Sequence, residues 1–517
     1  MNAPNCRELA EGEKTAPQAG LKYRMGTKEG LDYFFNAKSI AVIGASREPS
    51  KVGHVVLRNL FEGGFLGKVY PVTPSAQEIL GRKCHARVTD VKDSVELAIV
   101  AVKAELVASV LRDCARKKVK AAIILSSGFG EIGRTDLEKE ILDIASRAKM
   151  RLLGPNCLGV FDSFTHIDSM FLPEYRLARP KEGGIAYLSQ SGALGSTTLD
   201  WAAGKQIGIS KFISFGNASD VGVSELLEYL GDDDKTKVII GYIEGVKDGR
   251  KFYEAAKKVT RKKPVLILKG GTTQQGSKAA VSHTGTLAGS AKVYEGMFKQ
   301  SGIIQVHSIE DLFRFARALV DQPVPSSNKV QVITDGGGYG VIAADAIAKS
   351  DSLQLAELSP QTIQELKQKM PNYAVIGNPI DLTGDADAAR YQNAITAALK
   401  DPNVDSLVVI LLYQVPSVSS EIVETLVETQ MQSNKPMVVV STGGGFTEVH
   451  TKYLESKGVP VFNYPEEAVR ALDALSKYGA INRKNNNSHS PALQFLESKP
   501  STEKTLKKLR TAKKKKR

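Results

Sequence analysis

The sequence lacks any apolar run that is long enough to cross a membrane. None of the hydrophobic stretches in its 517 residues approaches the roughly 20 residues that a membrane-spanning helix needs. The first 26 residues, MNAPNCRELAEGEKTAPQAGLKYRMG, also lack the apolar core of a secretory signal. We therefore expect a cytoplasmic protein that has no membrane as a partner.

Cysteine is scarce as well. The four cysteines, Cys6, Cys84, Cys114 and Cys157, stand far apart in the chain. Their spacing matches neither a zinc site nor a disulfide framework. We expect free thiols in a reducing compartment, and no metal site.

Acidic residues are missing from the C-terminal end. Residues 504–517 carry nine Lys or Arg and no acid, so that only +4 of the formal net charge of +13 belongs to the other 503 residues. The excess charge is therefore that of a tail, and such tails are usually solvated. We expect nucleic acid to be bound weakly through this tail, if at all, and not as the main function.

The chain does contain a repeated alternation of short apolar runs and amphipathic stretches. The runs SIAVIGA (39–45), LAIVAV (97–102) and AAIILSS (121–127) alternate with stretches such as AELVASVLRDCARKK (104–118). Continuous Val/Ile/Leu runs between amphipathic helices are typical of parallel strands that are buried on both faces. The pattern predicts an α/β protein: a Rossmann-like domain followed by two flavodoxin-like domains, each with a doubly wound parallel sheet.

Two linker-like stretches, ARPKEGG (178–184) and DQPVPSSN (321–328), divide this series. We expect a flexible extension over 1–25, three α/β domains over 26–172, 173–325 and 326–480, and a disordered linker with the basic tail over 481–517. Translation that starts at Met25 rather than at Met1 is a hypothesis that N-terminal mass spectrometry would decide.

The first apolar run ends in a glycine turn, GASREPSKVG (44–53). Glycine between a strand and a helix suits a phosphate, because the helix N-terminus presents free N–H groups. The dinucleotide fingerprint G-x-G-x-x-G is not met after Gly44, and the next apolar run, KVYPVT (68–73), ends without the acid that would hold a ribose. NAD is therefore disfavoured. Another phosphate-bearing ligand and a simple packing turn both remain open.

Two further segments combine small residues with a strand end. LSQSGALG (188–195) places Ser191 and Gly192 at an expected helix start, which suits an anion but also an ordinary helix cap. Glu244 follows the apolar run KVIIGYI (237–243). A carboxylate there lies at the edge where α/β proteins bind ligands, although it could also cap a helix.

His283 lies in a run of small residues, KAAVSHTGTLAGS (278–290), which we interpret as a loop. Small neighbours leave the ring accessible and leave room for a bulky adduct. A carboxylate such as Glu244 could accept a hydrogen bond from one ring nitrogen and make the other nitrogen nucleophilic. The helix start at 191–195 could then neutralise a phosphoryl group on that nitrogen.

The third predicted domain has three glycine groups after apolar runs, TDGGGYG (334–340), GNPIDLTGDA (377–386) and STGGGFTE (441–448). No histidine or other nucleophile accompanies them in an obvious arrangement. We expect a structural or docking role for them.

Taken together, SIAVIGAS, LLGPNCLGV, LSQSGALG, YIEG, SHTGTLAGS and GNPIDL resemble, in order and in sequence, the α subunits of ADP-forming acetyl-CoA synthetases. These enzymes belong to the superfamily of NDP-forming acyl-CoA synthetases, which includes the succinyl-CoA synthetases. The resemblance covers about residues 28–480. Its most specific parts are SHTG…AG and GPNCLG.

The resemblance implies roles for particular residues. His283 would be the phosphorylated histidine, and Glu244 would orient it. The phosphoryl group would be held by the segments that contain Ser191, Gly192, Ala193 and Gly285. The resemblance places CoA against the glycine turn and the SSGFGE loop (126–131), with its thioester end at GPNCLG; the residues concerned are Gly44, Ala45, Ser46, Lys51, Gly53, Ser127, Gly128, Asn156 and Cys157.

The resemblance also implies a reaction and a partner. Acyl-CoA, phosphate and ADP would give acid, CoA and ATP through an acyl phosphate and a phosphohistidine. No stretch of this chain has room for an ATP-grasp domain, so ADP or ATP with Mg²⁺ would bind to a separate β subunit, in an α2β2 assembly. Thr73 and Lys103 differ from the residues usual in the family, and both border the expected CoA pocket. The alternative is a catalytically silent CoA-binding regulatory module, against which the retention of His283 and Glu244 argues.

Overall fold

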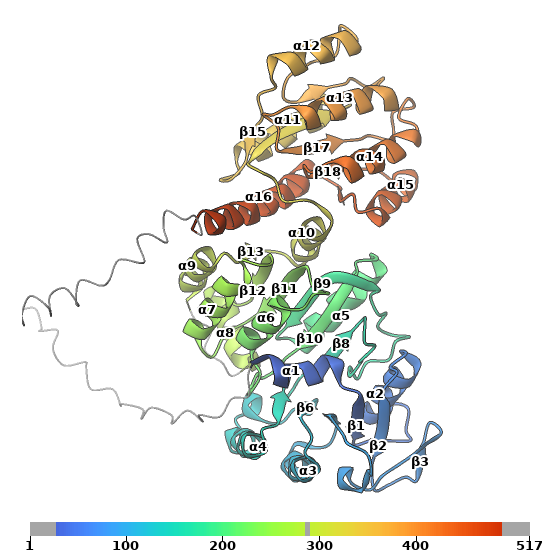
Figure 1. The fold of residues 1–517 in the computed structure, drawn as a ribbon, viewed down its shortest axis with the longest axis vertical. Helices are drawn as coiled ribbons and strands as arrows, with labels where there is room; N and C mark the ends of the chain where they lie inside the picture. The colour runs from blue at the N-terminus through green and yellow to red at the C-terminus, as the bar shows by residue number, and fades with distance from the viewer. Residues whose placement is uncertain (1–26, 285–289, 489–517) are drawn as a thin grey trace, which may run out of the picture.

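The computed structural model describes residues 27–284 and 290–488. The predicted extension over 1–25, Gly285 and the basic tail lie outside the described residues. Three mainly parallel sheets with helices on their faces follow one another along the long axis of the molecule (Figure 1). This arrangement confirms the predicted fold class.

The first sheet has the strand order β2-β1-β5-β6-β7, and all of its strands are parallel. All five residues of the interior strand β1 are buried, as expected for a strand that is covered on both faces. Its strands are β1 (Ser39–Ile43), β2 (Lys68–Val72), β5 (Leu97–Val100), β6 (Ala121–Ile124) and β7 (Arg151–Leu153), and its helices are α1 (Thr27–Asn36), α2 (Val52–Glu62), α3 (Ala104–Lys117) and α4 (Thr135–Ala148). Two short strands, β3 (Glu78–Ile79) and β4 (Arg82–Lys83), form a hairpin beside it.

The second sheet has the order β13-β12-β11-β9-β10-β8. Its strands are β8 (Gly159–Asp162), β9 (Glu182–Ser189), β10 (Ile209–Ser214), β11 (Val238–Ile243), β12 (Val265–Lys269) and β13 (Ile304–Val306). Its helices are α5 (Gly192–Gly204), α6 (Val223–Gly231), α7 (Gly249–Val259), α8 (Gln274–Thr284), α9 (Ala291–Ser301) and α10 (Ile309–Asp321).

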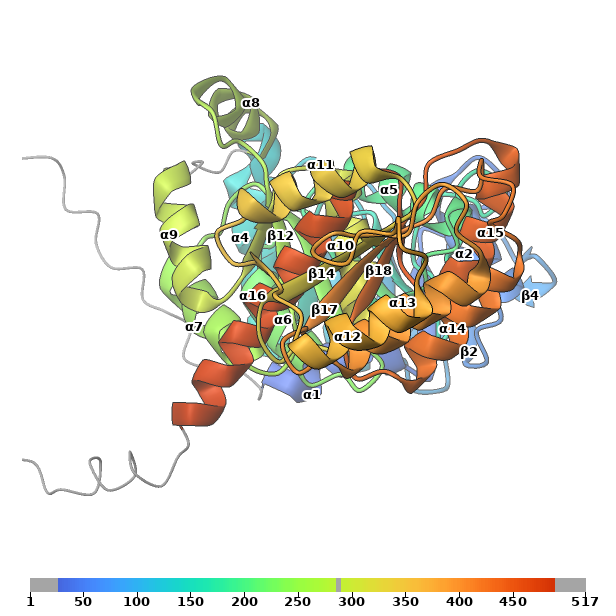
Figure 2. The same ribbon diagram turned by 90° about the horizontal axis from the view of Figure 1, so that it is seen from above.

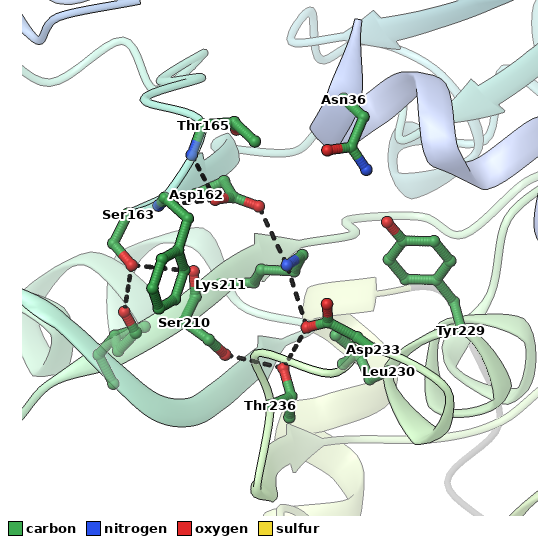
Figure 3. Close-up of polar contacts among 12 residues, drawn as sticks. Asn36, Asp162, Ser163, Thr165, Ser210, Lys211, Tyr229, Leu230, Asp233 and Thr236 are labelled. Carbon is green, nitrogen blue, oxygen red and sulfur yellow. Dashed lines mark hydrogen bonds and ion pairs between the residues drawn. The ribbon is translucent and has the colours of Figure 1, made fainter.

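Strand β8 differs from the sequence expectation. Its residues fall within the range 26–172 predicted for the first domain, yet β8 pairs antiparallel with β10 of the second sheet. Figure 3 shows the buried cluster beside this pairing, in which the Lys211 ammonium lies 3.1 Å from Asp162 of β8 and 3.0 Å from Asp233. The Asp162 carboxylate also accepts the N–H groups of Phe164 and Thr165. The Lys211 contacts and the pairing of β8 with β10 join distant parts of the chain, so local periodicity could not predict them.

The third sheet has the order β15-β14-β17-β18-β19, and β16 pairs with β14. Helices α11 and α16 lie on one face of this sheet, and α13 and α14 lie on the other (Figure 2). Its strands are β14 (Lys329–Thr334), β15 (Gln354–Leu355), β16 (Ile380–Asp381), β17 (Ser406–Ile410), β18 (Met437–Val440) and β19 (Val461–Phe462), and its helices are α11 (Gly337–Ala348), α12 (Pro360–Lys369), α13 (Ala388–Lys400), α14 (Glu421–Gln432), α15 (Gly445–Ser456) and α16 (Pro465–Ser488).

The last helix, α16, extends to Ser488 and therefore beyond the expected end of the third domain at residue 480. The Arg483 guanidinium donates a hydrogen bond to the carbonyl of Pro325, 2.9 Å away. Helix α16 also packs against α10 of the second domain, where Phe313 and Leu319 share one buried cluster with Leu472 and Leu475. The second and third domains therefore share a continuous core, and α16 is part of the contact between them.

No helix among residues 27–284 and 290–488 is both long enough and apolar enough to cross a membrane.

Candidate active site

A cavity of about 480 Å³ lies where the carboxyl ends of the first and second sheets meet. Its lining comes from the segments that follow β6, β7, β9 and β10, and from the chain between β8 and β9. Six residues that the sequence singled out line this one cavity: Ser127, Asn156, Cys157, Ser191, Gly192 and Ala193. The fold thus brings together six residues that lie up to 66 positions apart in the sequence, from Ser127 to Ala193.

Helix α5 begins at this cavity, as predicted. Ser191 is its N-cap, and the Ser191 hydroxyl accepts a hydrogen bond from the N–H of Leu194 at 3.4 Å. The first turn of a helix has N–H groups without carbonyl partners inside the helix, and these attract anions. Gly195 has to be small, because a Cβ there would lie 2.8 Å from the ring of Phe212. The helix start therefore serves as a cap and, in addition, faces a cavity.

Glu244 follows β11 directly, also as predicted, and it is 6% exposed. The Tyr242 hydroxyl donates a hydrogen bond to its carboxylate at 3.1 Å. The Gln190 side chain accepts the N–H of Glu244 at 2.7 Å, and the Lys269 ammonium donates to the Glu244 carbonyl at 2.7 Å. Gln190 is the residue between β9 and the N-cap Ser191. The structure therefore connects the position of Glu244 directly to the start of helix α5.

Lys269 is a buried cation beside this carboxylate. It is 5% exposed, and its ammonium lies 4.6 Å from the centre of the Tyr294 ring. Burial lowers the pKa of Lys269, and the neighbouring Glu244 opposes this effect. Burial also raises the pKa of Tyr242, and the neighbouring Glu244 carboxylate raises it further. Tyr242 therefore remains a hydrogen-bond donor at neutral pH. The sequence analysis did not find Gln190, Tyr242 or Lys269, because nothing in the local pattern distinguishes them from other residues at strand ends. It also did not find Tyr294, which comes from helix α9.

His283 lies in the last turn of helix α8, so the interpretation of its surroundings as a loop was wrong. The run of glycine, serine and threonine suggested a loop, but Gln274, Gln275, Ala279 and Ala280 favour a helix. The helix follows β12, the neighbour of β11 in the sheet, and lies at the edge of the molecule (Figure 2). The His283 side chain lies outside what the structure describes, as does the whole of Gly285.

The glycine turn after β1 is required by packing. Gly44 has φ +94°, and a Cβ there would lie 2.3 Å from the carbonyl oxygen of Ala101. A Cβ at Gly53 would lie 2.0 Å from the carbonyl oxygen of Gly44. These contacts account for both glycines without a ligand.

The turn also borders a second cavity. Gly44 and Thr73 line this cavity of about 210 Å³, which is mainly apolar. Ala45, Ser46, Lys51 and Gly53 line neither cavity. Lys103 is the N-cap residue of helix α3. Gly128, in the loop after β6, also lines neither cavity. The residues predicted to bind CoA are therefore divided between two cavities, the turn before α2 and the loop after β6.

Cys157 lies at the cavity wall as a thiol. It is 4% exposed, and its sulfur donates a hydrogen bond to the carbonyl of Ile124 at 3.3 Å. Burial raises the pKa of the Cys157 thiol to about 12. Because the thiolate is the nucleophilic form, Cys157 is not suited to act as a nucleophile at neutral pH.

Glu131 contacts the cavity residue Asn217, and the sequence analysis did not single it out. Its carboxylate accepts the N–H groups of Gly128 and Phe129, and also the side-chain amide of Asn217 from the second domain, at 2.6 Å. Asn217 in turn accepts a hydrogen bond from the Asn156 amide at 3.3 Å. The N–H of Gly128 is therefore used inside the protein. Glu131 and Asn217 lie 86 positions apart, which explains why no local pattern indicated the contact.

The pH dependence of this contact can be predicted. Burial alone would raise the pKa of Glu131, but the hydrogen bonds from Asn217, Gly128 and Phe129 outweigh it and hold the pKa below its ordinary value of 4.5. A lowered folded-state pKa stabilises the protein above that ordinary value and loses this effect as pH falls. We expect Glu131→Gln to lower the free energy of unfolding by about 1 kcal/mol at pH 7, because the carboxylate is partly solvated.

Urea unfolding at pH 7 and at several values below 4.5 measures this difference. The gap between the wild type and Glu131→Gln should shrink as pH falls. Glu62→Gln, at an exposed carboxylate on helix α2, is the matched control and should behave like the wild type. A gap that stays constant down to acid pH would show that the charge of Glu131 does not stabilise this contact.

Two of the three glycine groups of the third domain, at 334–340 and 441–448, follow strands, as the sequence indicated, whereas the group at 377–386 contains strand β16 itself. Gly336 caps helix α11, and Gly444 caps helix α15. The group at 443–445 lines a cavity of about 500 Å³ between the second and third domains, together with Arg314 and Arg317. Both arginines form ion pairs across this contact, with Glu467 and Glu455. These contacts are consistent with a structural role.

Comparisons with known proteins find matching family models and relatives over most of the chain. Three family models match: a CoA binding domain at residues 38–162, a succinyl-CoA ligase like flavodoxin domain at 182–319 and a ligase-CoA domain at 330–484. The alpha subunit of acetate–CoA ligase (ADP-forming) II from Pyrococcus furiosus is 41% identical over 86% of this chain and 97% of its own length.

A second relative is a longer chain. The acetate–CoA ligase (ADP-forming) of Methanocaldococcus jannaschii is 40% identical, and the match covers 87% of this chain but 64% of that protein. Among solved structures, the dinucleotide-forming acetyl-coenzyme A synthetase 1 of Ca. Korarchaeum cryptofilum, in complex with phosphate and ADP, has a TM-score of 0.84 and 37% identity. The match covers 89% of this chain and 99% of that chain.

Proposed function

The chain belongs to the family of ADP-forming acetate–CoA ligase alpha subunits, and we propose that in this chain His283 carries the phosphoryl group and Glu244 orients its imidazole. One observation carries the proposal. Gln190 lines the cavity beside the N-cap of helix α5 and accepts the backbone N–H of Glu244, so that a residue with a buried side chain is held close to a helix N-terminus that faces the cavity. A carboxylate that orients an imidazole and an anion-binding helix start are what phosphoryl transfer to histidine needs.

We propose the following steps. An oxygen of inorganic phosphate bonds to the thioester carbon of acyl-CoA, the carbon–sulfur bond breaks, and sulfur leaves with a proton as the CoA thiol. A ring nitrogen of His283 then bonds to the phosphorus of the acyl phosphate, and the acid leaves as its carboxylate. The terminal phosphate of ADP takes the phosphoryl group from His283 and becomes that of ATP. The helix α5 start would stabilise the charge that phosphate brings.

CoA would lie along the first sheet. Support comes from the match of residues 38–162 to a CoA binding domain and from two cavities at the carboxyl end of that sheet. Asn156 and Cys157 would face the thioester end, because they line the cavity that also contains the α5 start. A small apolar cavity beside Gly44 and Thr73 suits a flat ring such as adenine.

The nucleotide would bind to a partner. The relative from P. furiosus is named as an alpha subunit, and the relative from M. jannaschii carries additional length beyond the match. We propose a separate ATP-grasp β subunit that holds ADP or ATP with Mg²⁺, in an α2β2 assembly that works in the cytoplasm. The phosphohistidine would then pass its phosphoryl group between subunits.

The experiment that tests the proposal is labelling with radioactive phosphate. Purified chain is incubated with acetyl-CoA and labelled phosphate, with and without the candidate β subunit. We expect the protein to carry label that is lost in acid and retained in base, as is characteristic of phosphohistidine. When the β subunit is present, ADP should remove this label. A chain that binds CoA but takes up no label under either condition would contradict the proposal and favour a CoA-binding regulatory module.

A further inference from the structure

We propose that Phe171 and Leu172, here called the acyl wall, limit the size of the acyl group that the active-site cavity accepts. This inference rests on the proposed function. Both residues line the cavity of about 480 Å³, and both are half-buried. They belong to the segment between β8 and β9, whose residue types carried no signal in the sequence.

The cavity lining divides into a polar part and an apolar part. The polar part contains Ser127, Asn156, Gln190, Asn217 and the first turn of helix α5, whereas Leu125, Leu158, Phe171 and Leu172 form the apolar part. The two parts adjoin. A Cβ placed on Gly192 at the helix start would lie 3.7 Å from the Cβ of Leu158, which is van der Waals distance.

This adjacency determines where an acyl group has to lie. In an acyl phosphate the acyl carbon is joined to the phosphoryl group through a single oxygen. A phosphoryl group held at the α5 start therefore places the body of the acyl group a few ångströms away, where the apolar lining begins. Leu125 and Leu158 are 7% and 3% exposed, so each offers little surface. Phe171 and Leu172 expose more of their side chains to the cavity.

The backbone of the acyl wall is held from two sides. The Asn59 side chain, on helix α2 of the first domain, donates hydrogen bonds to the carbonyls of Met170 and Leu172 at 2.8 and 3.1 Å. The Arg179 guanidinium donates to the Leu172 carbonyl at 2.8 Å.

The same arginine forms a buried ion pair with Asp168 at 2.6 Å, and the side chains are 9% and 8% exposed. The Asp168 carboxylate also accepts the N–H of Met170 at 3.0 Å. A segment fixed by a buried ion pair and by hydrogen bonds from another domain cannot easily retract. A large acyl group therefore meets a fixed surface.

Discrimination by such a surface has a known scale. One methylene group in an apolar pocket changes the specificity constant of an enzyme by about 10- to 200-fold. Truncation of Phe171 or Leu172 removes several carbon atoms from the wall. The larger cavity should therefore admit acyl groups that the wild type excludes, while acetyl, which fits in either case, should be affected much less.

The test compares two substrates within each variant. The chain is combined with its β subunit, and kcat/KM for ATP synthesis is measured with acetyl-CoA and with phenylacetyl-CoA. We expect the ratio of phenylacetyl-CoA to acetyl-CoA to rise about tenfold or more in Phe171→Ala and in Leu172→Ala. Tyr175→Ala is the matched control, because Tyr175 belongs to the same segment but is 74% exposed. Its ratio should equal that of the wild type.

The ratio within one preparation does not depend on the fraction of active protein. Phe171 packs against the buried clusters of both neighbouring domains, so Phe171→Leu replaces Phe171→Ala if the latter does not fold. If the wild type is active but the ratio of phenylacetyl-CoA to acetyl-CoA is unchanged or lower in the variants at both positions, the acyl-wall proposal is wrong and the proposed function stands. A wild type that makes ATP from neither substrate overturns the proposed function instead.

Discussion

A His283→Ala variant is expected to lose ATP synthesis from acetyl-CoA, ADP and phosphate by roughly 10⁴-fold or more, while its affinity for CoA stays that of the wild type. The imidazole nitrogen would be the atom that forms the covalent bond to phosphorus, and alanine offers no atom in its place. The phosphorus–nitrogen bond also stores enough transfer potential to phosphorylate ADP, which a phosphoserine would not. Removal of the ring therefore removes a step and does not merely slow it.

Two measurements check this prediction. Coupled ATP production with the β subunit gives the rate, and equilibrium titration gives the affinity for CoA. His307→Ala is the matched control, because His307 is an exposed histidine that follows β13 of the same sheet, and it should retain full activity. Appreciable ATP synthesis by His283→Ala would refute the phosphohistidine relay, since no other route to ATP is proposed.

Glu244→Gln is expected to lower kcat by about 10²- to 10⁴-fold with little change in the KM for acyl-CoA. Glu244 is fixed at the end of β11 by three hydrogen bonds: its carboxylate accepts from the Tyr242 hydroxyl, its N–H donates to the Gln190 side chain, and its carbonyl accepts from the Lys269 ammonium. Glutamine keeps this shape but loses the negative charge that would stabilise a positively charged imidazole during transfer. The effect should therefore appear in the rate of phosphoryl transfer and not in substrate binding.

The rate at which label appears on His283 separates this role from a structural one. A positioning residue should slow the labelling in proportion to kcat, and its substitution should leave the unfolding midpoint near that of the wild type. Glu254→Gln, at an exposed glutamate on helix α7, serves as the control. If Glu244→Gln changed KM or stability but left the labelling rate intact, Glu244 would not act on His283.

Much of the fold could be predicted because strand and helix signals are local. The run SIAVIGA indicated a strand, and β1 occupies Ser39–Ile43; Ser191 was an expected helix start, and it is the N-cap of α5. The placement of Glu244 at a strand end was likewise confirmed. Each of these predictions depended on residues that are neighbours in the chain.

The errors have the opposite character. His283 is in a helix because alanine and glutamine outweigh the serine and glycine around them, a balance that the run of small residues concealed. Strand β8 pairs with β10 of the second sheet, and beside this pairing Lys211 contacts Asp162 and Asp233, which come from other parts of the chain. Helix α16 continues to Ser488, beyond the predicted domain end. Its apolar residues up to Tyr478 join a cluster with the second domain, and Arg483 donates to the Pro325 carbonyl; the sequence of the helix alone shows neither contact.

The sequence by itself determined the three α/β series, the strand ends that carry Ser191 and Glu244, and the resemblance that identified His283. It did so because apolar periodicity and short motifs record burial and chemistry over a few residues at a time. Only the tertiary structure decided that Ser127, Cys157 and the α5 start share one cavity, that Glu131 and Asn217 join the first two domains, and that Phe171 and Leu172 face the same space. These contacts join segments that are distant in the chain. They form because the edges of two sheets meet, and no local pattern encodes that meeting.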